Sequence, residues 1–193
     1  KRGFNNEGAH LEEELDKSLK RMGLDCVDLF YVHRRDHNIE IEEVTESLAN
    51  LVKKGKTKSI GYSEIAPSSL KRASAIHHIA AVQSEYSLST RAPEMGLVQA
   101  CEELGTALVA FSPVGRTFLT DNPLSYDFAQ TLDFTKVNPR FKQPNYDKNI
   151  IISDKFRKYS KDSGIASATL SIAWLLAKSE SIIPIPGTRS VKH

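Results

Sequence analysis

The sequence predicts an α/β protein built around a parallel sheet. Helix-like and strand-like segments alternate along most of the 193 residues. Polar side chains capable of chemistry follow the ends of successive strand-like segments. Alternation of this kind is typical of parallel βαβ units, in which a helix forms each crossover. The length favours one domain, so we expect residues 1–193 to form a single domain.

The first unit of this pattern begins with an amphipathic helix over residues 9–22, which carries leucines at helical spacing. Gly23 follows it and is well suited to end the helix in a left-handed conformation. The short apolar run over 25–33 that comes next is typical of a buried strand.

Further helices and strands alternate after this unit. The additional helices are expected over 40–54, 67–77, 93–103, about 150–163 and 166–178. The additional strands are expected over 57–63, 79–86, 106–112 and 181–186.

Residues 114–148 interrupt the alternation. This stretch is rich in Asn, Asp and Pro and has weak periodicity, which predicts a long loop. Loops of this length are usually functional or disordered.

Composition excludes several classes of partner. The 26 basic and 24 acidic residues leave a net charge of +2, which argues against nucleic acid and anionic membranes as partners. No apolar run approaches the roughly 20 residues needed to span a bilayer. No group of His, Cys, Asp and Glu has the spacing of metal ligands, so no metal is expected.

Cysteine usage indicates a reducing compartment. Cys26 and Cys101 both lie within apolar patterns, so we expect two buried free thiols rather than a disulfide framework. The polar N-terminal residues do not resemble a secretory signal. We therefore expect a cytoplasmic protein.

Two architectures fit the alternation. A doubly wound sheet would be expected to show G-x-G-x-x-G after its first strand, and the sequence has none. A full (β/α)8 barrel needs about 250 residues, but barrels build their active sites from polar residues at the carboxyl ends of the strands. The residues at such positions here are His33, Ser63, Gln83, Tyr86, Ser112 and Thr188.

Six stretches, in this order and at these spacings, resemble the aldo-keto reductases, which are NADP-dependent (β/α)8 TIM barrels. The stretches cover residues 18–25, 27–36, 60–64, 82–88, 111–116 and 183–188. The resemblance implies about five parallel strands with their helices, from about the fourth barrel strand through the eighth. Residues 1–9 resemble the stretch after the third strand, and His193 resembles the position before the closing helix. The N-terminal strands and the C-terminal end of the barrel are then expected to be missing.

The implied activity is reduction of an aldehyde or ketone to an alcohol by hydride transfer from NADPH. Of the family's catalytic Asp, Tyr, Lys and His, only the last can be carried over, onto His33. An imidazole N–H at that position orients and polarises the substrate carbonyl. From the residues alone, a rim-facing or core histidine is the alternative reading of His33.

The resemblance also assigns cofactor contacts. Ser63 and Gln83 are expected to bind the nicotinamide carboxamide, and Tyr86 to stack on the nicotinamide ring. Glu64 stands where many members carry Asn.

Two further segments are assigned to the cofactor phosphates. The segment containing Ser112, Pro113, Gly115 and Arg116 is expected to wrap the pyrophosphate. Gly187, Thr188 and Arg189 are expected to form a phosphate site at a helix start, with Arg189 favouring NADP through its 2′-phosphate. Residues from 117 to about 148 would form a loop that folds over the cofactor or borders the substrate pocket.

Two alternatives to an active enzyme remain at this stage. One is a non-catalytic NADP-binding regulatory subunit, and the other is an inactive fragment. The expected partner is a small-molecule carbonyl compound, and the oligomeric state stays open.

Overall fold

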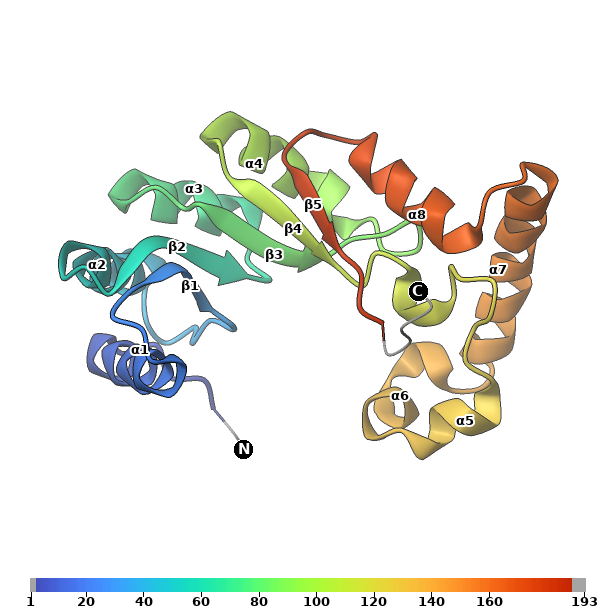
Figure 1. Cartoon of the computed structure of the whole chain (residues 1–193), viewed down its shortest axis with the longest axis horizontal. Coiled ribbons are helices and arrows are strands. Elements are labelled where there is room, and N and C mark those ends of the chain that lie inside the picture. Colours follow the sequence, from blue (N-terminus) through green and yellow to red (C-terminus); the bar gives the residue numbers. More distant parts are fainter. Residues whose placement is uncertain (1–2, 189–193) are drawn as a thin grey trace. The chain divides into compact units, whose positions relative to one another are not determined.

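A computed structural model describes residues 3–188 (Figure 1). The contacts divide this chain into two compact units. The first unit contains the described residues up to Glu85, together with Ala92–Ala110 and Ser181–Ile183. The second unit contains Tyr86–Arg91, Phe111–Glu180 and the described residues from Pro184 onwards.

The predicted helices and strands of the first part of the chain are present, with their ends shifted by a few residues. The helices are α1 (Gly8–Met22), α2 (Ile41–Lys53), α3 (Pro67–Ile76) and α4 (Leu97–Leu104), with a short 3₁₀ helix η1 (Ala92–Met95) before α4. The strands are β1 (Val27–Val32), β2 (Thr57–Ser63), β3 (Ala81–Glu85) and β4 (Ala107–Phe111), and β5 (Ile182–Ile185) follows late in the chain.

The strands form one sheet in the order β1-β2-β3-β4-β5. β1 pairs with β2, and β2 with β3, in parallel as the alternation predicts. The register places Ser63 opposite Gln83 and places Gly61 between Tyr31 and Ala81. Because parallel strands run in the same direction, the residues that follow β1, β2 and β3 lie at one edge of the sheet.

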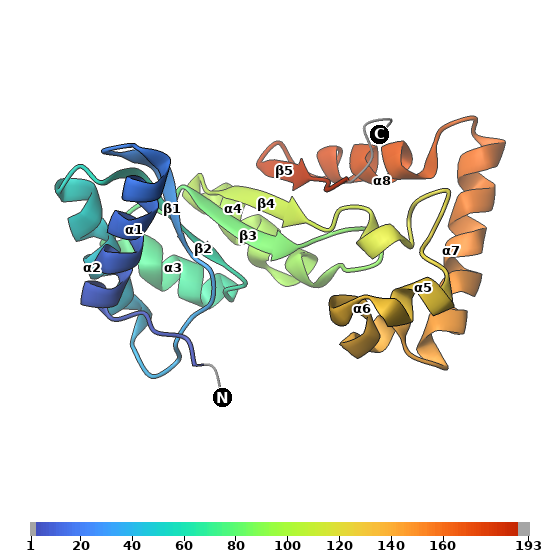
Figure 2. The same cartoon turned by 60° about the horizontal axis from the view of Figure 1, so that its bottom comes forward.

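Helices α1, α2 and α3 pack side by side in the first unit, and α2 also packs on β2 (Figure 2). Their inward faces bury Leu15, Ile41, Leu48 and Leu70. Gly23 ends α1 in the left-handed conformation that the sequence predicts, with a φ of 66°.

A buried polar pair connects α2 to the sheet. The hydroxyl of Tyr62 lies 2.7 Å from Oγ1 of Thr45, which itself donates to the carbonyl of Ile41 at 2.7 Å. The single proton of Thr45 is used for Ile41, so Tyr62 is the donor to Thr45. Burial raises the pKa of Tyr62 to about 12.

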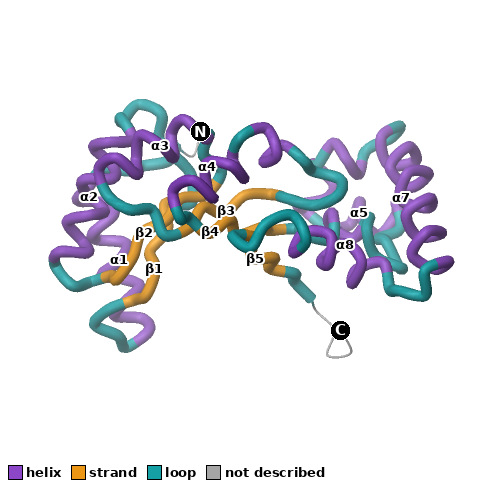
Figure 3. Tube along the Cα trace, turned by 90° about the horizontal axis from the view of Figure 1, so that it is seen from above, coloured by secondary structure: helices purple, strands orange, loops and turns teal. Residues whose placement is uncertain are grey.

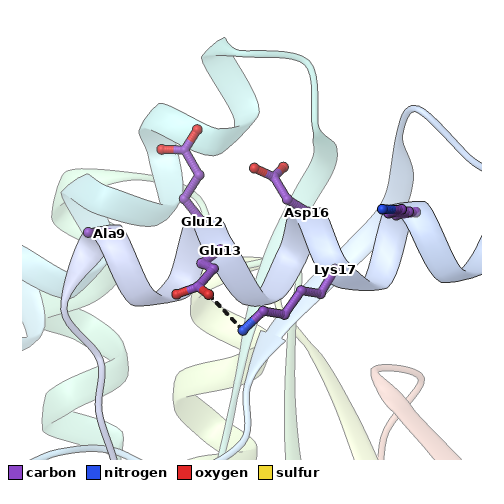
Figure 4. A pocket seen from close by; sticks show the side chains of 6 residues that line it. Ala9, Glu12, Glu13, Asp16 and Lys17 are labelled. Carbon is purple, nitrogen blue, oxygen red and sulfur yellow. Dashed lines mark ion pairs between the residues drawn. The ribbon is translucent and has the colours of Figure 1, made fainter.

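The outer face of α1 carries ion pairs. Lys17 pairs with Glu13 and Glu14, as the helical spacing predicts. Glu12 instead reaches Lys54 at 2.6 Å and Lys56 at 2.8 Å, and these lysines lower its pKa to about 2. A hollow of about 470 Å³ lies along this face (Figure 4). None of the residues that line it is a predicted site residue: Ala9, Glu12, Glu13, Asp16, Lys17 and Lys20.

The predicted long loop over 114–148 is wrong, because this stretch is largely helical (Figure 3). The elements in and after it are η2 (Gly115–Thr117), α5 (Tyr126–Thr131), α6 (Asp133–Val137), η3 (Pro139–Phe141), α7 (Asn145–Asp162) and α8 (Ser167–Leu176). Helices of five or six residues are too short to produce a periodic apolar pattern. Polar residues of this stretch cap two of its elements. Ser125 accepts from the N–H of Phe128 at the start of α5, and Asn138 accepts from the N–H of Arg140 at the start of η3.

An aromatic cluster holds these short helices together. Phe118, Ala129, Phe141 and Tyr146 form its buried centre. The rings of Phe118 and Phe141 stack with their centroids 4.9 Å apart, and the Tyr146 hydroxyl donates to the carbonyl of Leu124 at 2.8 Å. The segment therefore has a small core of its own within the second unit. Within residues 3–188, no helix is both long enough and apolar enough to cross a membrane.

Candidate functional site

His33 ends the apolar run of β1 and is exposed at the carboxyl edge of the sheet. Its ring makes no hydrogen bond with any residue in the described range 3–188. Its backbone carbonyl accepts a hydrogen bond from Nη1 of Arg34 at 2.6 Å. An exposed imidazole at this edge can hydrogen-bond the oxygen of a small molecule.

The loop that follows His33 is fixed by one buried side chain, Asn6, which is 4% exposed. Its Nδ2 donates to the carbonyl of Arg34 at 3.2 Å, and its Oδ1 accepts from the N–H of Asp36 at 2.7 Å. Both ends of the Asn6 amide are thereby satisfied by loop backbone. The role of Asn6 is not predictable from the sequence, because nothing near it in the chain indicates a partner about 30 residues away.

Ser63 and Gln83 are neighbours across β2 and β3, as the sequence predicts for two residues at adjacent strand ends. Oγ of Ser63 accepts a hydrogen bond from Nη1 of Arg34 at 3.0 Å. Because Arg34 can only donate, the hydroxyl proton of Ser63 is available to another acceptor.

Glu64 ties the ends of β2 and β3 together. Its N–H donates to the carbonyl of Gln83 at 2.8 Å, while its Oε1 accepts from Ser84 Oγ at 3.1 Å and from the N–H of Glu85 at 2.8 Å. This requires a φ of 55°, which is uncommon for a residue other than glycine, Asn or Asp. The carboxylate is therefore committed to the backbone and side chain of β3.

Left-handed backbone gathers in the segment predicted to bind the pyrophosphate. Ser112 has a φ of 52°, and Gly115, Arg116 and Thr117 follow with 58°, 53° and 80°. Each such non-glycine residue costs roughly 1–2 kcal/mol. Strain of this kind persists where surrounding structure enforces it, and it concentrates at ligand sites.

Packing enforces this conformation in the second unit. The N–H of Gly115 donates to the carbonyl of Ser112 at 2.9 Å, and Ser171 Oγ holds the carbonyl of Pro113 at 2.7 Å. A Cβ on Gly115 would lie 2.8 Å from Ser89 Oγ. Position 115 requires glycine for two reasons: its φ is positive, and there is no room for a Cβ atom.

Arg116, predicted to supply a cation to the pyrophosphate, lies over aromatic rings. Its guanidinium carbon is 4.6 Å from the ring centroid of Phe134 and 5.9 Å from that of Phe111. Cation–π contacts of this kind hold a guanidinium in place.

The remaining predicted cofactor residues of the second unit differ in exposure. Tyr86, predicted to stack on the nicotinamide, is fully buried and meets Trp174 edge-to-face at 5.6 Å between centroids. Its N–H donates to the carbonyl of Phe111 at 3.3 Å. Gly187 and Thr188 are exposed, and Arg189 lies outside the described residues.

The structure therefore brings the predicted residues together in two sets. His33, Ser63 and Gln83 belong to the first unit, whereas Tyr86 and the residues from Ser112 to Arg116 belong to the second.

Neither the cysteines nor the potential metal ligands of residues 3–188 form a further site. Cys101 is a buried free thiol as predicted, and burial raises its pKa to about 12. The prediction that Cys26 is buried is wrong, because it lies next to the exposed start of β1 and is only half-buried. Among residues 3–188, no group of His, Cys, Asp and Glu side chains is arranged to hold a metal ion.

Comparison with known proteins places this geometry in context. Residues 2–193 match the model of the aldo/keto reductase family. The chain is 41% identical over 193 residues to aldo-keto reductase yakc of Schizosaccharomyces pombe, whose name includes NADP(+). It is 37% identical over 194 residues to aldo-keto reductase str7 of Strobilurus tenacellus. These alignments cover 98% and 99% of this chain but only 57% and 58% of the two relatives.

Solved structures resemble the chain over a similar share of their length. A glycerol dehydrogenase of Gluconobacter oxydans matches with a TM-score of 0.81 and 24% identity, over 96% of this chain and 56% of that one. A thermostable aldo-keto reductase matches with a TM-score of 0.71 and 28% identity, over 95% of this chain and 57% of that one. The predicted fold class, a (β/α)8 TIM barrel represented by about five parallel strands and their helices, is confirmed.

Proposed function

Because the chain belongs to the aldo/keto reductase family, we propose that it takes part in the NADPH-dependent reduction of an aldehyde or ketone to an alcohol. The observation that carries the proposal is the exposed His33 at the same sheet edge as Ser63 and Gln83. NADPH would supply the hydride to the carbonyl carbon, and the carbonyl oxygen would take up a proton to give the alcohol. The chain spans about 57% of the length of its curated relatives. Activity is therefore tested with the full-length gene product.

His33 is the catalytic residue in this proposal. Its exposed ring donates an N–H to the substrate carbonyl oxygen, which orients the carbonyl and stabilises the negative charge that develops on it. Asn6 holds the backbone of the loop directly after His33, at Arg34 and Asp36.

Ser63 and Gln83 are proposed to bind the nicotinamide carboxamide. Since Arg34 donates to Ser63, the Ser63 hydroxyl is set up to donate to the carboxamide oxygen. Gln83 carries both a donor and an acceptor and suits a carboxamide partner. Glu64 keeps the ends of their two strands together.

Phosphate contacts are proposed within the second unit. The left-handed backbone of Gly115 and Arg116, with Ser112 and Pro113 before it, suits close approach of a pyrophosphate. Gly187, Thr188 and Arg189 are proposed to contact the adenosine phosphate, whereas the fully buried Tyr86 presents no surface to the nicotinamide ring in this structure. NADP(H) is therefore the proposed cofactor. A single domain over residues 1–193 and a cytoplasmic location complete the proposal.

The test follows NADPH consumption with an aromatic aldehyde and compares His33→Ala with the matched control His37→Ala. His37 is exposed on the same loop and has no assigned role. We expect His33→Ala to lower kcat by about 10²- to 10⁴-fold, with little change in the Kd for NADPH, and His37→Ala to change neither.

Two results would contradict this assignment. Equal losses of kcat and NADPH affinity in His33→Ala would make His33 a structural residue. Tight NADPH binding by the unaltered protein without turnover of any aldehyde or ketone would favour a regulatory NADP-binding subunit over an enzyme.

A further inference from the structure

Arg34 lies directly after His33 and reaches across the edge of the sheet. Its Nη1 donates to the His33 carbonyl at 2.6 Å and to Ser63 Oγ at 3.0 Å. The guanidinium therefore lies among the strand ends at which the proposed function puts the carbonyl substrate. A guanidinium has five N–H donors, and these two bonds use only those of Nη1.

No acidic side chain in the described part of the chain pairs with Arg34, although it is half-buried. The neighbouring carboxylate of Asp36 is occupied in its own turn, where its Oδ1 accepts from the N–H of Asn38 at 3.0 Å and from its Nδ2 at 2.8 Å. By contrast, the guanidinium of the exposed Arg72 forms an ion pair with the carboxylate of Glu42, with 2.6 Å between Nε and Oε1. A partly desolvated cation without a counter-charge is unfavourable, so an arriving anion gains more there than at an exposed arginine.

The position of Arg34 is fixed before any ligand arrives. Asn6 holds the carbonyl of Arg34 on one side and the N–H of Asp36 on the other. The Nη1 bonds then fix the guanidinium itself. Little conformational entropy remains to be lost when a ligand binds, which favours affinity.

From this geometry we propose that Arg34 binds a carboxylate of the substrate, so that the protein prefers carbonyl compounds that carry a carboxylate over neutral ones. The inference rests on the proposed reductase function and specifies its substrate class. The fork of the guanidinium matches the two oxygens of a carboxylate, whereas a lysine would offer only a point charge.

The test compares 4-carboxybenzaldehyde with its neutral methyl ester, methyl 4-formylbenzoate, as substrates of the protein as encoded. The variants are Arg34→Met, which keeps the apolar stem, and Arg34→Lys, which keeps the charge. Arg21→Met is the matched control, because Arg21 is exposed on α1 and, within the described residues, hydrogen-bonds only to Ser18. Thermal unfolding of each variant checks folding. Calorimetric titration with benzoate, which cannot be reduced, measures anion binding apart from turnover.

We expect the unaltered protein to favour the acid over the ester in kcat/KM. Arg34→Met should lower kcat/KM for the acid by about 10- to 100-fold, mainly through KM, and should weaken benzoate binding in parallel. The ester should lose only what the Arg34–Ser63 contact contributes, so its kcat/KM should fall several-fold less than that of the acid. Arg34→Lys should retain part of the preference, and Arg21→Met should behave as the unaltered protein.

Three outcomes would overturn the inference. The first is that the unaltered protein and Arg34→Met both reduce the acid and the ester with equal kcat/KM. That result would contradict the preference for a carboxylate and would leave the proposed reductase function intact. A rise in the Kd for NADPH, with equal losses for both aldehydes, makes Arg34 a positioning residue for Ser63. If neither aldehyde is reduced, the proposed function fails, and the substrate class fails with it.

Discussion

Gly61 is closely enclosed by neighbouring strands in the sheet of the first unit. It lies in β2, with Tyr31 opposite on β1 and Ala81 opposite on β3. A Cβ added there would lie 2.7 Å from Cε1 and 2.9 Å from Cδ1 of Tyr31, and 2.8 Å from the carbonyl oxygen of Ala81. The ring of Tyr31 can tilt away, whereas the Ala81 oxygen belongs to a paired strand.

We therefore expect Gly61→Ala to destabilise the protein. Overpacking a well-packed site typically costs 1–3 kcal/mol, so we take about that range as the gross cost. Loss of glycine's freedom in the unfolded chain offsets about 0.4–1 kcal/mol. The expected net loss is about 1–2 kcal/mol in the free energy of unfolding. Urea unfolding followed by circular dichroism measures it, with an unchanged m-value as the sign that only stability has altered.

Two comparisons make this prediction sharp. Gly3→Ala is the control, because a Cβ at Gly3 meets nothing within 4 Å, and it should leave stability nearly unchanged. Repeating Gly61→Ala in a Tyr31→Ala background removes two of the three contacts, so the penalty should shrink. A Gly61→Ala protein as stable as the parent, or a penalty unaffected by Tyr31→Ala, would refute this account of the close packing.

Two further predictions concern charge and thiol chemistry. The lysine partners depress the Glu12 pKa from 4.5 to about 2, so its contribution to stability is present above pH 4.5 and is lost as pH falls toward 2. Glu12→Gln should accordingly lower Tm near neutral pH in low salt, and the difference from the parent should vanish in strong acid or high salt; a constant difference would contradict this. Since the pKa of Cys101 is about 12 and its side chain is buried, a thiol reagent at mildly alkaline pH should label Cys26 first and Cys101 only on unfolding. Mass spectrometry of the labelled peptides measures the order, and equal rates would count against it.

Sequence patterns predicted the alternating part of the fold well, for identifiable reasons. The leucines of α1 and the apolar run of β1 have unambiguous periods, and Gly23 and Pro67 mark helix ends. Periodicity did not reveal the helices within residues 114–148, because α5 and α6 each complete fewer than two turns. The N-cap residues Ser125 and Asn138 were the available signal.

The candidate site was predictable only where it follows from strand ends. His33, Ser63 and Gln83 are found because polar residues ending successive parallel strands must lie along one edge. The role of Asn6 depends on contacts with residues about 30 positions away, which no local pattern encodes. The left-handed backbone at Arg116 and Thr117 could not be predicted for another reason, since glycine is the residue type whose presence indicates a positive φ.

The division of the chain into two units limits how it can be dissected. Each unit is assembled from three separate stretches, and the chain passes between them near Tyr86, Ala92, Phe111, Ser181 and Pro184. Neither unit can be produced by simple truncation, because any single cut leaves stretches of both units on the same fragment. A separately folding half would require rejoining its stretches with new linkers. Mapping of binding activity should therefore rely on point substitutions rather than deletion series.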